Sequence, residues 1–96
     1  EKMPVSSIRG KSLKAVTYDI ADGYTTVNPL FLKPIDIESL TGLYHEIMKA
    51  QVMVRGEKFP TSDTVAIRTR NVRLQRLHSA LMIIRNFARE RRIILV

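Results

Sequence analysis

Arginine is the residue type that gives this sequence its clearest chemical character. Residues 65–96 contain eight basic residues, all of them arginine, and one acidic residue, Glu90, so this third carries a charge equal to the chain's whole net charge of +7. A guanidinium group stays charged at neutral pH, and its planar fork of N–H donors matches the oxygens of phosphate or carboxylate. The pattern indicates a binding module for an anionic partner, with nucleic acid as the first choice and an acidic protein surface as the second.

We expect four of these arginines to contact the anionic partner: Arg68, Arg73, Arg76 and Arg89. An alternative interpretation is that the arginines pair with the acidic residues of the preceding segment, because residues 36–64 carry a net charge of −2. The carboxylates of that interpretation are mainly Glu38, Glu46 and Glu57. They are too few for every arginine, so the sequence predicts that Arg73 and Arg76, in the middle of their helix, remain unpaired.

Residue combinations typical of enzymes are weak. The chain has no cysteine, which excludes a disulfide scaffold, a cysteine-based zinc finger and a thiol nucleophile. Gly10-Lys11-Ser12 matches the end of a phosphate-binding loop, but Val5 stands where the first glycine of that motif is required. His45 and His78 have no placed carboxylate that would complete a metal site. We therefore expect a non-enzymatic protein with no cofactor and no bound metal.

Two helices should position the arginines. Asp36 is a suitable N-cap for a first helix, whose apolar residues recur at helical spacing over residues 40–54 and which Gly56 can end. A second helix should begin near residues 61–63 and run close to Arg91, because neither proline nor glycine interrupts it. The short connection predicts an antiparallel helical hairpin.

The second predicted helix is apolar on two sides. One side can face the first helix, and we expect the other to form an interface through Val65, Val72, Ile83 and Phe87. Either a β-hairpin of the same chain or a second subunit must cover these four side chains. A protein-interaction or homodimerisation domain with no nucleic-acid role is therefore the alternative function.

Residues 13–31 suggest extended structure. Val16, Tyr18 and Ile20 alternate as on one face of a strand, residues 21–23 can turn, and residues 24–27 can return as a second strand. Residues 93–96 are Ile-Ile-Leu-Val and suit a C-terminal strand, unless they precede a further strand or a membrane segment of a longer protein. The predicted fold class is α+β: a small β-hairpin, with or without a C-terminal strand, packed on an antiparallel two-helix hairpin.

The length of 96 residues suits one domain. We expect residues 1–12 to form a flexible basic arm and residues 13–96 to form a single α+β domain. No apolar run reaches the roughly 18–20 residues that a membrane span requires, and no signal-peptide pattern is present. The sequence therefore predicts no membrane span and a cytoplasmic location.

Overall fold

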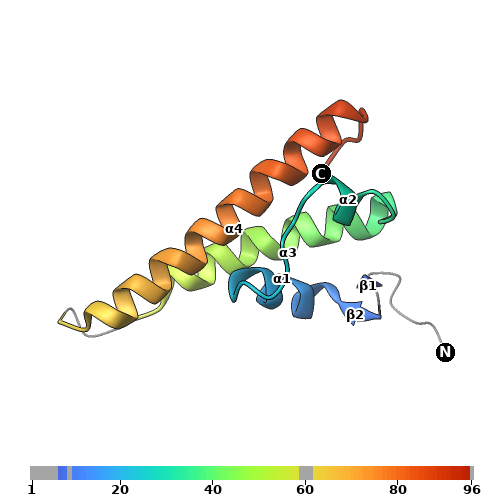
Figure 1. Cartoon of the computed structure of the whole chain (residues 1–96). Coiled ribbons are helices and arrows are strands. Elements are labelled where there is room, and N and C mark those ends of the chain that lie inside the picture. Colours follow the sequence, from blue (N-terminus) through green and yellow to red (C-terminus); the bar gives the residue numbers. More distant parts are fainter. Residues whose placement is uncertain (1–6, 9, 59–61, 96) are drawn as a thin grey trace.

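Four helices dominate the computed structural model, which describes residues 7–8, 10–58 and 62–95 (Figure 1). The helices are α1 (Leu13–Ala21), α2 (Pro29–Leu32), α3 (Ile37–Gly56) and α4 (Thr64–Glu90), and two short strands, β1 (Ser7–Ile8) and β2 (Lys11–Ser12), pair antiparallel. The predicted α+β fold is therefore wrong, because the domain is helical. Over the described residues, no helix is both long and apolar enough to pass through a bilayer.

The two long helices, α3 and α4, form the antiparallel pair that the sequence predicts (Figure 1). Each begins at an aspartate whose side chain accepts a backbone hydrogen bond: Asp36 from the Ser39 amide at 3.1 Å, and Asp63 from the Ala66 amide at 2.9 Å. These N-caps satisfy amide groups that have no partner inside the helix. The helices lie close at their connection and diverge toward their other ends, where α2 packs against α4 (Figure 1).

Helix α1 occupies the residues for which the sequence predicted the first strand of a hairpin. Ser12 caps it by accepting a hydrogen bond from the Ala15 amide at 3.1 Å. The buried residues Leu13, Val16 and Ile20 are spaced three and four apart, which places them on one helical face. The turn at residues 22–23 does form, but it ends a helix, and residues 24–27 pair with no strand among the described residues.

The described part of residues 1–12 contacts the rest of the domain. Ile8 pairs with Lys11 across the two-stranded sheet and is 5% exposed in the hydrophobic core. Residues 1–6 and 9 of the predicted arm lie outside the described residues.

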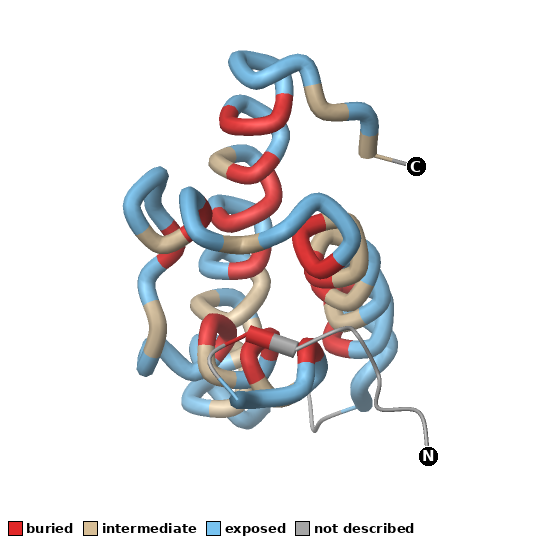
Figure 2. The backbone as a smooth tube through the Cα atoms, turned by 90° about the vertical axis from the view of Figure 1, so that its right-hand side faces the viewer, coloured by how far each residue is buried: buried red, intermediate tan, exposed pale blue. Residues whose placement is uncertain are grey.

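The core lies where α1, α3 and α4 meet. Its fully buried large side chains are Leu40, Leu43 and Ile47 from α3, Leu77 and Ile84 from α4, and Leu32 from α2. Figure 2 shows that buried positions gather on the inner sides of the helices, while the outer sides are exposed. Burial of apolar area, at about 25 cal/mol per Å², holds α1, α3 and α4 together.

The predicted C-terminal strand is wrong, because residues 93–95 form no regular structure. Helix α4 ends instead in a Schellman motif, in which the Ile93 amide donates to the Ala88 carbonyl at 2.8 Å and the Arg92 amide donates to the Arg89 carbonyl at 3.1 Å. The chain then folds back, and Ile93 and Leu95 pack against the core. A short apolar run can thus be buried without the neighbouring strand that a sheet would need.

The Schellman motif predicts that glycine is favoured over alanine at position 92. Arg92 has a φ of 58°, in the left-handed region where glycine is favoured and a Cβ is strained. We expect Arg92→Gly to be more stable than Arg92→Ala by about 1 kcal/mol, since both remove the charge and only alanine keeps the Cβ. Urea denaturation of the two variants measures the difference. Equal stabilities would contradict the strain at this residue.

The N-cap of α3 predicts a pH-dependent contribution to stability. Hydrogen bonds from the Ser39 side chain, and then from its amide, lower the pKa of Asp36 below its usual value. A carboxyl whose pKa is lower in the folded state stabilises the fold above its unfolded pKa of about 3.9 and loses that effect as pH falls through the folded pKa.

We therefore expect Asp36→Ala to lose about 1 kcal/mol at neutral pH, and Asp36→Asn, which keeps a capping oxygen, to lose much less. The difference between the wild-type protein and Asp36→Asn should shrink in acid. Thermal melts of both proteins, from neutral pH down through the pKa of Asp36, provide the test. A difference in stability that does not change with pH would contradict the contribution of the ionised N-cap.

Candidate functional site

Three arginines of α4 bind the C-terminal ends of other helices. Arg76 Nη1 donates to the Ala21 carbonyl at 3.0 Å, at the end of α1, and Arg70 Nη2 donates to the Arg55 carbonyl at 3.3 Å, near the end of α3. Arg73 Nε lies 3.4 Å from Oδ1 of Asp22, the C-cap of α1. The prediction that Arg73 remains unpaired is wrong. Arg76 has no carboxylate partner among the described residues, but it is engaged by a backbone carbonyl.

The Arg76 guanidinium lies directly over Gly23. An added Cβ at this glycine would lie 2.9 Å from Arg76 Cζ and 3.0 Å from its Nη2, closer than ordinary van der Waals contact. Gly23 also has a φ of +85°, which disfavours other residues. The glycine is therefore needed both for the turn after α1 and for the approach of Arg76 to the end of that helix.

The remaining α4 arginines are not neutralised by the acidic residues of α3. In the portion of the chain that the structure describes, no carboxylate forms an ion pair with Arg68, Arg76, Arg85 or Arg89. Glu46 pairs instead with Lys49 at 3.3 Å, and Arg85 donates to the Tyr44 hydroxyl at 3.0 Å. The interpretation that α3 neutralises α4 therefore fails for these four arginines, partly because the helices diverge.

One side of α4 points away from the core and carries no carboxylate between Arg68 and Arg89. We call it the α4 outer face; its residues, all exposed and within a narrow arc of the helix, are Arg68, Asn71, Gln75, Ser79, Met82, Asn86 and Arg89. At 1.5 Å per residue the two arginines are about 31 Å apart along the helix. Arg89 donates to Asn86 at 3.2 Å. Of the four predicted anion-binding residues, the structure thus brings two to this face and directs two toward α1.

The four residues predicted to form an interface do not share one exposed surface. Phe87 is 7% exposed within the single chain, with the Arg91 guanidinium 4.4 Å from its ring centroid, and Ile83 packs against the core. Val72 is half-buried, and Val65 is 73% exposed. A second subunit is therefore not needed to bury Phe87.

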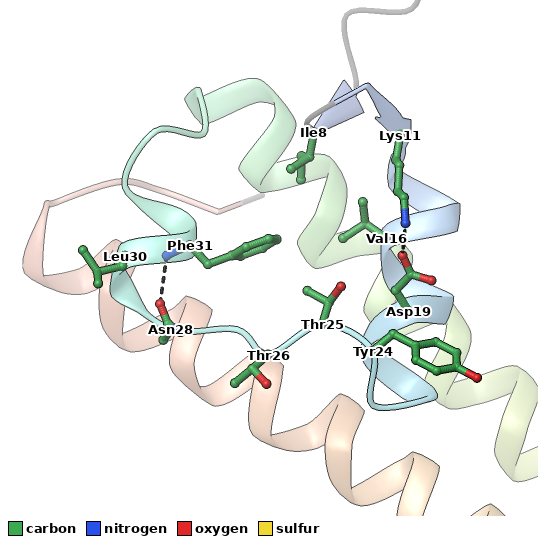
Figure 3. Close-up of a pocket in the computed structure, with 10 residues that line it drawn as sticks. All are labelled: Ile8, Lys11, Val16, Asp19, Tyr24, Thr25, Thr26, Asn28, Leu30 and Phe31. Atoms are coloured by element: carbon green, nitrogen blue, oxygen red, sulfur yellow. Dashed lines mark hydrogen bonds and ion pairs between the residues drawn. The ribbon is translucent and has the colours of Figure 1, made fainter.

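A groove of about 510 Å³ lies between α1, the segment after it and α2 (Figure 3). Lys11 and Asp19 form an ion pair at 2.6 Å on one wall, and Phe31 lies on the opposite side (Figure 3). The Lys11 ammonium and the Asp19 carboxylate satisfy each other, so neither is held as an isolated acid or base. Tyr24, at 82% exposure, stands at the rim.

The two histidines do not assemble a metal site. His45 and His78 are exposed on α3 and α4, and His45 lies beside the Tyr44 ring at a centroid distance of 6.0 Å. Over residues 7–8, 10–58 and 62–95, no group of three histidine, cysteine or acidic side chains is arranged to hold a metal ion.

Comparisons of the chain with protein-family models, with curated proteins and with solved structures found no match.

The contact between Gly23 and Arg76 predicts an energetic coupling. We expect Gly23→Ala to destabilise the domain by about 1 kcal/mol through its φ alone, and by about 1 kcal/mol more by displacing Arg76 from the Ala21 carbonyl. In an Arg76→Ala background only the first loss should remain. Urea denaturation of the two single variants and the double variant completes the cycle, and strictly additive losses would show that the contact does not contribute.

Proposed function

We propose that this chain is a non-enzymatic nucleic-acid-binding module that uses the α4 outer face. The observation that carries the proposal is the composition of that face: arginines at both ends, amides, a hydroxyl and the Met82 side chain between them, and no carboxylate from Arg68 to Arg89. Arginines can contact phosphates and fix the position of a duplex, while asparagine and glutamine amides can hydrogen-bond to base edges. A cytoplasmic location belongs to the same proposal.

Nucleic acid is favoured over an acidic protein surface because the cationic groups are arginines and are widely spaced. The phosphates of a duplex repeat along its whole length, so a rigid helix of about 40 Å can place both ends against them. Dimerisation is the alternative, but Val65 is the only one of the four predicted interface residues that the structure leaves largely exposed.

Salt dependence of duplex binding tests the proposal. We expect a labelled duplex to bind with an affinity that falls steeply with salt, with each phosphate contact adding about 0.9 to the slope of log K against log salt. Arg68→Gln and Arg89→Gln should each weaken binding and reduce the slope by about one. Lys14→Gln removes one charge from α1 and should leave the slope unchanged.

Fluorescence anisotropy measures these affinities, and light scattering of the same samples reports the oligomeric state. Absence of duplex binding at low salt would exclude the proposed function. If polyglutamate displaces the labelled duplex as effectively as an unlabelled duplex does, an acidic protein partner would be favoured instead. A concentration-dependent dimer that Val65→Glu dissociates would support the alternative.

A further inference from the structure

A second pocket, separate from the groove of Figure 3, lies between α4 and the segment that follows α1. It has a volume of about 390 Å³ and is lined by Ile20 of α1, by residues 23 and 25–27, and by Gln75, Arg76, Ser79, Ala80 and Ile83 of α4. Thr25 and Thr26 line both pockets, and Figure 3 shows their side chains extending from opposite sides of the chain. The segment therefore acts as a wall between the two.

Arg76 is held in this second pocket and keeps guanidinium N–H donors that make no hydrogen bond among the described residues. Its Nη1 is fixed by the Ala21 carbonyl at 3.0 Å, and Gly23 allows the guanidinium to lie against the backbone. A guanidinium has five N–H donors, and this is the one hydrogen bond that Arg76 makes among the described residues. The cation is thus positioned by the fold before any ligand binds, which reduces the entropy lost on binding.

The rest of the lining suits an anion with an apolar part. Gln75 and Ser79 add polar donors on the α4 side, and none of the described residues that line the pocket is acidic. Two carboxylates, Asp19 and Asp22, are adjacent in sequence to residues that line the pocket. They are paired with Lys11 at 2.6 Å and with Arg73 at 3.4 Å, so their charges are offset. Ile20, Val27 and Ile83 provide apolar walls that a bare phosphate ion would leave unfilled.

We propose that this pocket binds a small organic oxyanion, with its phosphate or carboxylate group on Arg76 and its apolar group against Ile20, Val27 and Ile83. The proposal does not rest on the proposed nucleic-acid function. Gln75 and Ser79 belong to both surfaces, however, so a backbone phosphate of a bound duplex is a second source of the same chemistry, and the experiment must separate the two.

NMR titration with phenyl phosphate, with benzoate and with the neutral benzyl alcohol tests the pocket. We expect both anions to cause saturable shifts of the Gly23 and Ser79 amide signals, and the neutral compound to cause none at the same concentration. Arg76→Gln should weaken anion binding about tenfold, the effect of losing a charge-assisted hydrogen bond. Arg55→Gln, the matched loss of an exposed arginine on α3, should leave it unchanged.

Each outcome decides between the possibilities. Shifts that do not saturate, shifts centred away from Gly23 and Ser79, or equal effects of Arg76→Gln and Arg55→Gln would overturn the pocket. If Arg76→Gln fails to fold, Ser79→Ala provides the second variant, and its anion affinity must fall severalfold for the proposal to stand. Binding of a duplex but of neither small anion would overturn the small-molecule proposal and leave the proposed function intact. Binding of the anions without the duplex would exclude the proposed function and leave the pocket intact.

Discussion

Helices α1 and α3 both end against α4, and arginines of α4 place positive charge at the C-terminal end of each. The last carbonyls of a helix have no donor within it, and the helix dipole makes that end negative. Helix α1 has no basic residue in its own last turn. Arg70, Arg73 and Arg76 follow one another at intervals of three and so lie on the same side of α4, where they reach Arg55, Asp22 and Ala21. Arg73 and Arg76 thus fix the C-terminal end of α1 against α4, in addition to the apolar packing of α1 in the core.

The arginines of α4 therefore divide by orientation. Those that turn toward α1 and α3 are bound to carbonyl, carboxylate or tyrosine hydroxyl oxygens of the domain itself, whereas Arg68 and Arg89 lie on the α4 outer face without a carboxylate partner among the described residues. The two sets have the same chemistry, and only the fold separates them. A net charge of +7 thus overstates the charge that a partner can contact.

The parts of the fold that could be predicted from the sequence are those with local signals. Helices α3 and α4 combine long apolar periodicity with an aspartate N-cap, and both were expected close to their observed limits. Helix α1 has nine residues, and over that length Val16, Tyr18 and Ile20 fit a strand as well as a helix. The N-cap residue Ser12 is the local signal that could have favoured a helix over a strand for these residues. A C-terminal strand would have required a neighbouring strand, which the helical α1 removed.

The candidate site was less predictable because its contacts join distant segments. Ala21 precedes Arg76 by 55 residues, and no periodicity within either segment predicts that the two are in contact. Gly23 looked like an ordinary turn residue, yet the same glycine ends α1 and gives Arg76 its place beside the second pocket. Because one side chain both caps α1 and lines that pocket, an anion bound there would contact the group that holds α1 in place. Ligand affinity and the stability of α1 should then be linked through Arg76, since a ligand that binds only the folded arrangement stabilises it.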